Sequence, residues 1–257
     1  EEGGYEEDDI SAGVINDIVD ERTQITAESN RVVVFWEGSW DGGKGFAVRI
    51  EGQGDAQLWI TGTGAAAPGT TLGLVFDKAI KNGTIAVPAS HPELLAVGCT
   101  LNRTGWRSYL LLGKLELESF GTMTPPVADS TCYFSGAGPT PNGGMKPDLL
   151  APGAFVAAAM SRDADPRLQS GSIFDAPGCP DPTRPCYLGD DSHALSSGTS
   201  MSAPCVAGAA ALLLQAEPNL DQGEAMEILT AGAARPTGQV PYEYQQGPGE
   251  LDLLGAL

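Results

Sequence analysis

A short run of hydroxyl residues followed by an apolar segment carries the clearest chemical signal in this chain. Residues 196–215 read SSGTSMSAPCVAGAAALLLQ, so that Gly198 stands two residues before Ser200 and an alanine-rich stretch follows. Gly198 can adopt the backbone angles of a tight turn, and Pro204 is tolerated in a first helical turn. A serine at a helix start lies beside free N–H groups, which suit the oxyanion formed when serine attacks a carbonyl carbon. The pattern predicts a nucleophilic Ser200; the alternative is a small-residue helix start without a chemical role.

The same run resembles the nucleophile motif of the subtilisin-like serine proteases, the subtilases. Residues 198–204, GTSMSAP, match that motif with Ser200 in the place of the attacking serine. Further segments are similar to other parts of the family and follow in the family's order: residues 84–99, residues 134–140 (FSGAGPT) with 146–153 (KPDLLAPG), and residues 247–253. The resemblance covers roughly residues 83 to 257. It implies peptide-bond hydrolysis by Ser200, whose own N–H contributes to the oxyanion hole, with Gly198 and Thr199 shaping the turn.

No base for Ser200 is recognisable before it in the sequence. The subtilisin triad follows the chain order Asp, His, Ser, but this chain has no Asp-Thr/Ser-Gly or His-Gly-Thr segment and only two histidines. His91 falls in a loop between expected strands. His193 is close to Ser200 in sequence, but a structural or surface role is the simpler interpretation because the family supplies its base from a separate helix.

A serine without an adjacent base is a weak nucleophile. We therefore expect these residues to be the C-terminal part of a larger subtilase, completed by an upstream half that supplies Asp and His. Alone, the chain is expected to be inactive. The alternative is a subtilase-fold pseudoprotease that serves as a binding or regulatory module.

The cysteines suggest an oxidising compartment. Cys179 and Cys186 bracket a proline-stiffened loop, so we expect a local disulfide in an extracellular or cell-envelope protein, with two free thiols as the alternative. Cys99 and Cys205 lie in apolar runs and are expected to be buried thiols. Cys205 also replaces the histidine usual in the family motif, a departure that concerns local packing more than the nucleophile.

Residues 1–82 lack these motifs. They open with an acidic stretch unlike a signal peptide, and then carry β-branched and aromatic runs separated by glycine and aspartate turns: residues 31–36, 46–50, 57–60 and 72–76. This spacing is typical of a β-sandwich. Some subtilases, including clostridial germination proteases, resemble the chain in having a β-rich insertion. We therefore expect an α/β fold in which residues 83–257 form the C-terminal portion of a subtilisin-like parallel-sheet domain. Residues 1–82 would form a preceding β-rich, sandwich-like insertion, or a small independent β-sandwich.

The expected helix can be placed more closely. It should begin at Ser200 and run through about Gln215, because Pro218 just beyond cannot continue it. Its face should pack on a sheet whose strands include the regions around residues 95–97 and 149–150. The residues on that face at helical spacing are Val206, Ala209, Ala210 and Leu213.

Composition excludes some partners and leaves metals unassigned. A net charge of −19 argues against nucleic acid, and the apolar run at residues 203–214 is too short to predict a membrane span. Gly189-Asp190-Asp191 offers two adjacent carboxylates, too few to define the calcium site that is common in the family. We assign no metal or cofactor, and the expected partners are a peptide or protein substrate and the upstream half of the protease.

Overall fold

The computed structural model describes residues 2–7, 10–17, 31–38, 47–60, 78, 80–109, 113–140, 142–161, 163, 179, 186–238, 240 and 244–256. The chain divides into two compact units, Glu1–Ile80 and Lys81–Leu257. Each unit is described by itself.

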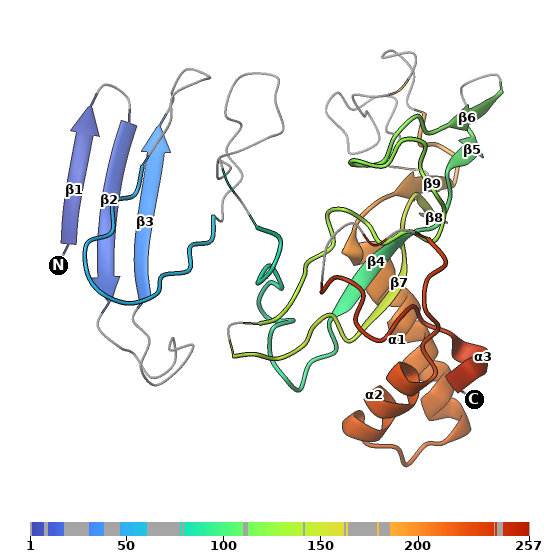
Figure 1. The fold of residues 1–257 in the computed structure, drawn as a ribbon. Helices are drawn as coiled ribbons and strands as arrows, with labels where there is room; N and C mark the ends of the chain where they lie inside the picture. The colour runs from blue at the N-terminus through green and yellow to red at the C-terminus, as the bar shows by residue number, and fades with distance from the viewer. Residues whose placement is uncertain are drawn as a thin grey trace. The chain divides into compact units, whose positions relative to one another are not determined.

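The first unit contains an antiparallel sheet in the order β1-β2-β3, drawn in blue in Figure 1. Its strands are β1 (Glu2–Glu7), β2 (Ile10–Asp17) and β3 (Arg31–Gly38). The strand predicted at residues 31–36 is confirmed as β3. Residues 47–50 and 57–60 were expected to be strands and are not. Strand propensity depends on cross-strand partners, and among the described residues these runs pair with no strand. Phe46 and residues 72–76 lie outside the described residues.

The second unit is built on a parallel pair of strands, β4 (Val97–Leu101) and β7 (Leu149–Ala154). Backbone bonds extend this pair on both sides. The Cys132 N–H donates to the Cys99 carbonyl (2.8 Å) beside β4, and the Leu150 N–H donates to the Gly249 carbonyl (2.7 Å) beside β7. The predicted α/β fold with a parallel sheet is confirmed. The start of the family-like segment 84–99 forms no strand; it is held by backbone hydrogen bonds such as that from the Thr84 N–H to the Ala137 carbonyl.

Helix α1 (Thr199–Ala216) packs on β4 and β7, as Figure 1 shows for the orange helix. Its buried face includes Val206, Ala209 and Leu213, which share a core cluster with Leu149 of β7; Ala210 is partly buried against it. The predicted helix and its sheet-facing residues are therefore confirmed. The placement of Pro204 was wrong, because α1 begins at Thr199 and the proline falls in the second turn. Since proline has no N–H, the Ser200 carbonyl loses its usual helical donor.

The remaining elements surround this core. Helix α2 (Gln222–Ala231) begins with a capping box between Asp221 and Glu224, and α3 (Leu253–Ala256) is a single short turn. Two antiparallel pairs complete the described strands: β5 (Gly105–Arg107) with β6 (Lys114–Glu116), and β8 (Val156–Ala159) with β9 (His193–Ser196).

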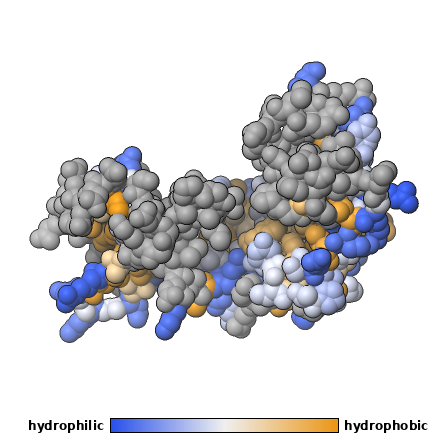
Figure 2. Space-filling view, turned by 90° about the horizontal axis from the view of Figure 1, so that it is seen from above, coloured by the Kyte–Doolittle hydropathy of each residue, from blue (hydrophilic) through white to orange (hydrophobic). Residues whose placement is uncertain are grey.

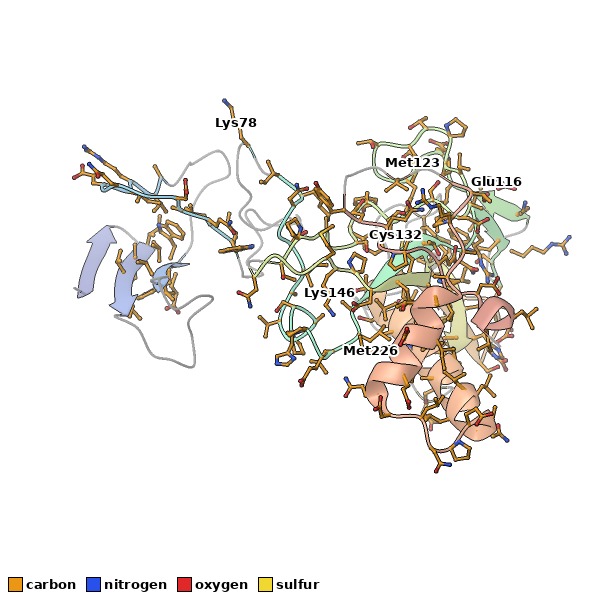
Figure 3. The ribbon with its side chains drawn as sticks, turned by 60° about the horizontal axis from the view of Figure 1, so that its bottom comes forward. Lys78, Glu116, Met123, Cys132, Lys146 and Met226 are labelled. Atoms are coloured by element: carbon orange, nitrogen blue, oxygen red, sulfur yellow. A yellow bond between two sulfur atoms is a disulfide. The ribbon has the colours of Figure 1, made fainter. Side chains whose placement is uncertain are left out.

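A buried ion pair holds the start of β7. Lys146, labelled in Figure 3, donates from Nζ to the Leu94 carbonyl and to Asp148 Oδ2, both at 2.6 Å. The same Asp148 oxygen accepts the Ala96 N–H at 2.6 Å. The Lys146 side chain is 5% exposed and that of Asp148 16%. The KPD sequence thus joins the segments that lead into both parallel strands.

Apolar side chains also reach the surface, where orange areas lie among blue ones in Figure 2. In the first unit they include Val32 and Phe35 of β3, and in α1 they include Leu212 and Leu214.

The apolar run at residues 203–214, judged too short for a membrane span, lies within a longer helix. Helix α1 has 18 residues and is long and apolar enough to cross a membrane by length and composition. Because one face of α1 packs on the sheet, we interpret it as a core helix.

Candidate active site

The turn before α1 presents Ser200 at the helix N-terminus. Gly198 has φ 156° and ψ 159°, a conformation open essentially to glycine alone. Its N–H donates to the Gly153 carbonyl at 2.8 Å, which ties the turn to the end of β7. Ser200 is exposed and Thr199 is half-buried. The predicted position of Ser200 on a helix start is therefore confirmed, and the residue is accessible to a ligand from outside.

Ser202 lies beneath this turn. Its side chain is fully buried, and its hydroxyl has no hydrogen-bond partner among the described residues. A Cβ atom on Gly153 would collide with that hydroxyl and would lie 2.9 Å from both Cys99 Sγ and the Gly198 carbonyl oxygen. Only glycine at position 153 allows strand, helix start and Cys99 to approach so closely. Ser202 and Gly153 were not predicted to have this role.

A buried disulfide supports the same region. Cys99 of β4 pairs with Cys132, labelled in Figure 3, with a Cα–Cα distance of 5.3 Å and both residues fully buried. The prediction of a Cys99 thiol was therefore wrong. Cys132 lies beside Cys99 because its N–H pairs with the Cys99 carbonyl, a contact that spacing along the chain does not reveal.

Two more polar residues fix this disulfide segment. The Ser135 hydroxyl accepts the Cys99 N–H at 3.1 Å. Gln245, which is fully buried, donates from Nε2 to the Ser135 carbonyl at 2.6 Å and to the Cys132 carbonyl at 3.4 Å. Ser135 belongs to the FSGAGPT segment, so part of that segment supports β4. Gln245 was missed by sequence reasoning, because no motif marks it.

Cys205 is free and half-buried. Its Sγ lies 3.5 Å from the Met201 carbonyl oxygen and 4.0 Å from that of Pro152. The prediction of a thiol is confirmed, but burial is only partial. The side chain sits between the first turns of α1 and the end of β7, so its effect is on local packing.

Both histidines make their described hydrogen bonds to residues near them in the chain. His193 is exposed, and its Nδ1 lies 2.9 Å from Asp190 Oδ2. In the β8–β9 ladder Val156 pairs with Ser196 and Ala159 with His193. At about 3.3 Å per residue, His193 lies roughly 10 Å along β9 from Ser196, the end of the strand that leads into the Ser200 turn. Among the described contacts of His193, none is a hydrogen bond to Ser200.

The other ionisable contacts of this loop are local. Hydrogen bonds from the Ser192 N–H and from His193 lower the pKa of Asp190 to about 2. His91 is exposed, and its Nδ1 accepts the Glu93 N–H at 3.2 Å. Within the described part of the chain, the hydrogen bonds of His91 and His193 are local, in line with a structural or surface role.

The predicted disulfide is present. Cys179 and Cys186 are joined, with a Cα–Cα distance of 5.6 Å. Their pairing is confirmed, and the alternative of two free thiols is wrong. The proline-stiffened residues between them lie outside the described residues.

No group of three or more His, Cys, Asp or Glu side chains that could hold a metal ion gathers within the described ranges. The two carboxylates at Asp190 and Asp191 include one already bound to His193 and Ser192. The lack of an assigned metal or cofactor stays a prediction. Chemically, the described site offers an exposed serine at a helix N-terminus, supported by a buried disulfide and backbone hydrogen bonds.

Comparison with known proteins finds serine proteases that are similar to part of this chain. Serine protease AprX of Bacillus subtilis (strain 168) is 33% identical over 120 residues, which make up 46% of this chain and 24% of that protein. Subtilisin-like protease SBT4.4 of Arabidopsis thaliana is 32% identical over 149 residues, 56% of this chain and 18% of that protein. The chain thus spans less than a quarter of the length of either relative.

The match to the family as a whole is more extensive. A model of the subtilase family matches residues 63–252, which is most of the chain and includes the turn at Gly198, Ser200 and both parallel strands. Its first matched residues precede the second compact unit, which starts at Lys81. With the α/β fold and a serine at the start of a sheet-packed helix, this match shows that the chain belongs to the subtilase family.

Proposed function

We propose that the chain is the nucleophile-bearing portion of a serine endopeptidase and that Ser200 attacks the substrate's peptide carbonyl. The observation that carries the proposal is the exposed Ser200 at the N-terminus of α1, on a turn tied by the Gly198–Gly153 hydrogen bond. Attack yields an acyl-enzyme and releases the amine portion of the peptide; water then releases the acid portion. The substrate is a peptide or protein.

The helix start supplies the electrostatic part of the reaction. The first N–H groups of an α-helix have no partner within the helix, and the helix dipole favours negative charge there. We propose that the Ser200 N–H donates to the oxyanion, while Thr199 and Gly198 shape the turn. Fixed donors lower the barrier because they need not reorganise as charge develops on the carbonyl oxygen.

The proton on the Ser200 hydroxyl requires a base, and the proposed base comes from outside this chain. His193 is held about a strand's length from the turn, and His91 lies in a separate exposed turn. We propose an upstream half of the same protease as the partner that supplies His and Asp. A pseudoprotease that binds or regulates is the second candidate, favoured by the local hydrogen bonds of both histidines, none of which reaches Ser200 among the described contacts.

Peptide hydrolysis tests these alternatives. The isolated chain should hydrolyse a mixed peptide library no faster than its Ser200→Ala variant, because it has no adjacent base. The same library is then given to the full-length gene product with and without Ser200→Ala. Loss of hydrolysis in the full-length variant supports the nucleophile; equal rates in both full-length proteins would favour the pseudoprotease. Hydrolysis by the isolated chain that Ser200→Ala abolishes would overturn the requirement for an outside base.

The surrounding features support two accompanying proposals. Two disulfides, Cys99–Cys132 and Cys179–Cys186, are typical of proteins in oxidising compartments, so we propose an extracellular or cell-envelope location. The sheet β1-β2-β3 supports a β-rich insertion at residues 1–82. Non-reducing peptide mapping of the native protein tests the first, since free and alkylatable thiols at all four positions would contradict it.

A further inference from the structure

A chain of contacts outside the subtilase motifs leads from one disulfide to the Ser200 turn. Its first link is Trp106 of β5, which is 7% exposed. The Trp106 indole Nε1–H donates to the Cys186 carbonyl at 2.9 Å. Cys186 is held by its disulfide to Cys179. The indole is therefore fixed to a covalently closed loop.

The second link is aromatic. The Trp106 ring stacks on Phe155, with centroids 4.8 Å apart and planes at 22°, and on Tyr187 at 5.5 Å and 26°. Phe155 has φ 56°, a left-handed conformation that is unfavourable for a residue with a side chain. Such a conformation persists only where the surroundings hold it. The Phe155 ring stacks on Trp106 and Tyr187 and also contacts Phe120.

The third link reaches the turn. The Phe155 N–H donates to the Ser197 hydroxyl at 2.9 Å, and Ser197 directly precedes Gly198. Strand β9 enters the same turn, and the Leu195 N–H of β9 donates to the Tyr187 carbonyl at 2.7 Å. The Ser200 turn is therefore linked to Cys186 through Trp106, Phe155 and Ser197. It is also linked to Tyr187 through β9.

We propose that Trp106 is a positioning residue for the Ser200 turn: through Phe155 and Ser197 it couples the Cys179–Cys186 loop to the backbone that presents the nucleophile. Its catalytic meaning rests on the function proposed above. The claim that Trp106 positions the turn does not rest on that function. It concerns how firmly the backbone of the turn is held, which can be measured without any activity. Trp106 itself does not touch the reacting atoms.

Amide hydrogen exchange followed by NMR tests the proposal on the full 257-residue chain. Trp106→Phe keeps an aromatic ring but removes the indole donor. We expect exchange at the Phe155 and Gly198 amides to become about tenfold faster, the factor expected when a net hydrogen bond is lost. The Ala225 amide in α2, which donates to the Asp221 carbonyl at 3.0 Å, should keep its rate. Trp59→Phe is the matched control, because it makes the same replacement in the other compact unit.

A double-variant comparison separates coupling from general loosening. Ser197→Ala removes the acceptor of the Phe155 N–H, and in Trp106→Phe/Ser197→Ala the Gly198 rate should rise by less than the product of the two single increases. Rates that multiply fully, unchanged local rates, or an equal rise at Ala225 would each overturn the proposal. If Trp106→Phe does not fold, Cys179→Ser/Cys186→Ser opens the anchoring loop and is judged by the same amides. Failure of peptide hydrolysis leaves these readouts intact, so the two proposals can fail separately.

Discussion

Replacing Lys146 by methionine should destabilise the second unit strongly. The Lys146 ammonium makes two hydrogen bonds of 2.6 Å, to the Leu94 carbonyl and to Asp148 Oδ2, with its side chain 5% exposed. Lys146→Met removes both bonds and leaves the Asp148 carboxylate with only the Ala96 N–H among these partners. Breaking a buried ion pair by removing one partner costs about 3–5 kcal/mol, a large part of the roughly 5–15 kcal/mol that stabilises a typical domain.

The comparison of single and double variants gives the sharper test. In Lys146→Met/Asp148→Asn the charge is gone from both positions, and the side-chain oxygen of the introduced asparagine can still accept the Ala96 N–H. The double variant should therefore be more stable than Lys146→Met, by about 1–3 kcal/mol. Urea unfolding followed by far-ultraviolet circular dichroism measures each free energy. A loss below about 1 kcal/mol in Lys146→Met, or strictly additive losses, would refute the claim that the pair is a coupled support of β7.

Three further outcomes follow from the packing and charges of the second unit. Ala209→Glu, on the sheet-facing side of α1, should lower the free energy of unfolding by about 3 kcal/mol or more because it buries a carboxyl group. Its control, Ala211→Glu on the exposed side, should change that free energy by under about 1 kcal/mol in the same urea assay. The Asp190 carboxyl should titrate near pH 2 in a carbon-13 NMR titration. Its contribution to the stability of the fold is then complete above about pH 4 and is lost as the pH falls through about 2. A titration midpoint near pH 4 would contradict its bonds to Ser192 and His193. Burial raises the pKa of Glu250, with the nearby Asp129 charge adding to the effect, so the ionised form of Glu250 destabilises the fold. Glu250→Gln should therefore raise the thermal unfolding midpoint at pH 7 and raise it much less near pH 4. An equal rise at both pH values would contradict this.

The helix and its sheet could be predicted from the sequence because their signals are local. Gly198 and Ser200 mark a turn and helix start, and Val206, Ala209 and Leu213 recur at the spacing of one helical face. The outcome for Pro204 shows the limit of such signals. The local pattern placed this proline in the first helical turn, but it lies in the second turn and leaves the Ser200 carbonyl without its helical donor.

The support beneath the site could not be predicted, because it joins distant segments. Cys99 and Cys132 are 33 residues apart, and Gln245 bonds to Ser135 across 110 residues. Nothing in the spacing of five cysteines selects Cys132 over Cys205 as the partner of Cys99. Only the backbone pairing of Cys132 with Cys99 places their Cβ atoms within reach of a disulfide. The same holds for the runs at residues 47–50 and 57–60, whose strand propensity finds no partner in the described structure.

Closeness in sequence was also a poor guide to the base. His193 and Ser200 are separated by seven positions, but most of that stretch is an extended strand whose pairing with β8 carries the histidine away from the turn. A strand advances about 3.3 Å per residue against about 1.5 Å in a helix, so the same spacing within a helix would have kept the two side chains much closer. The Asp190 carboxylate further holds the His193 ring at the far end of β9. This extended geometry is the physical reason for the proposal that the base of Ser200 comes from another segment.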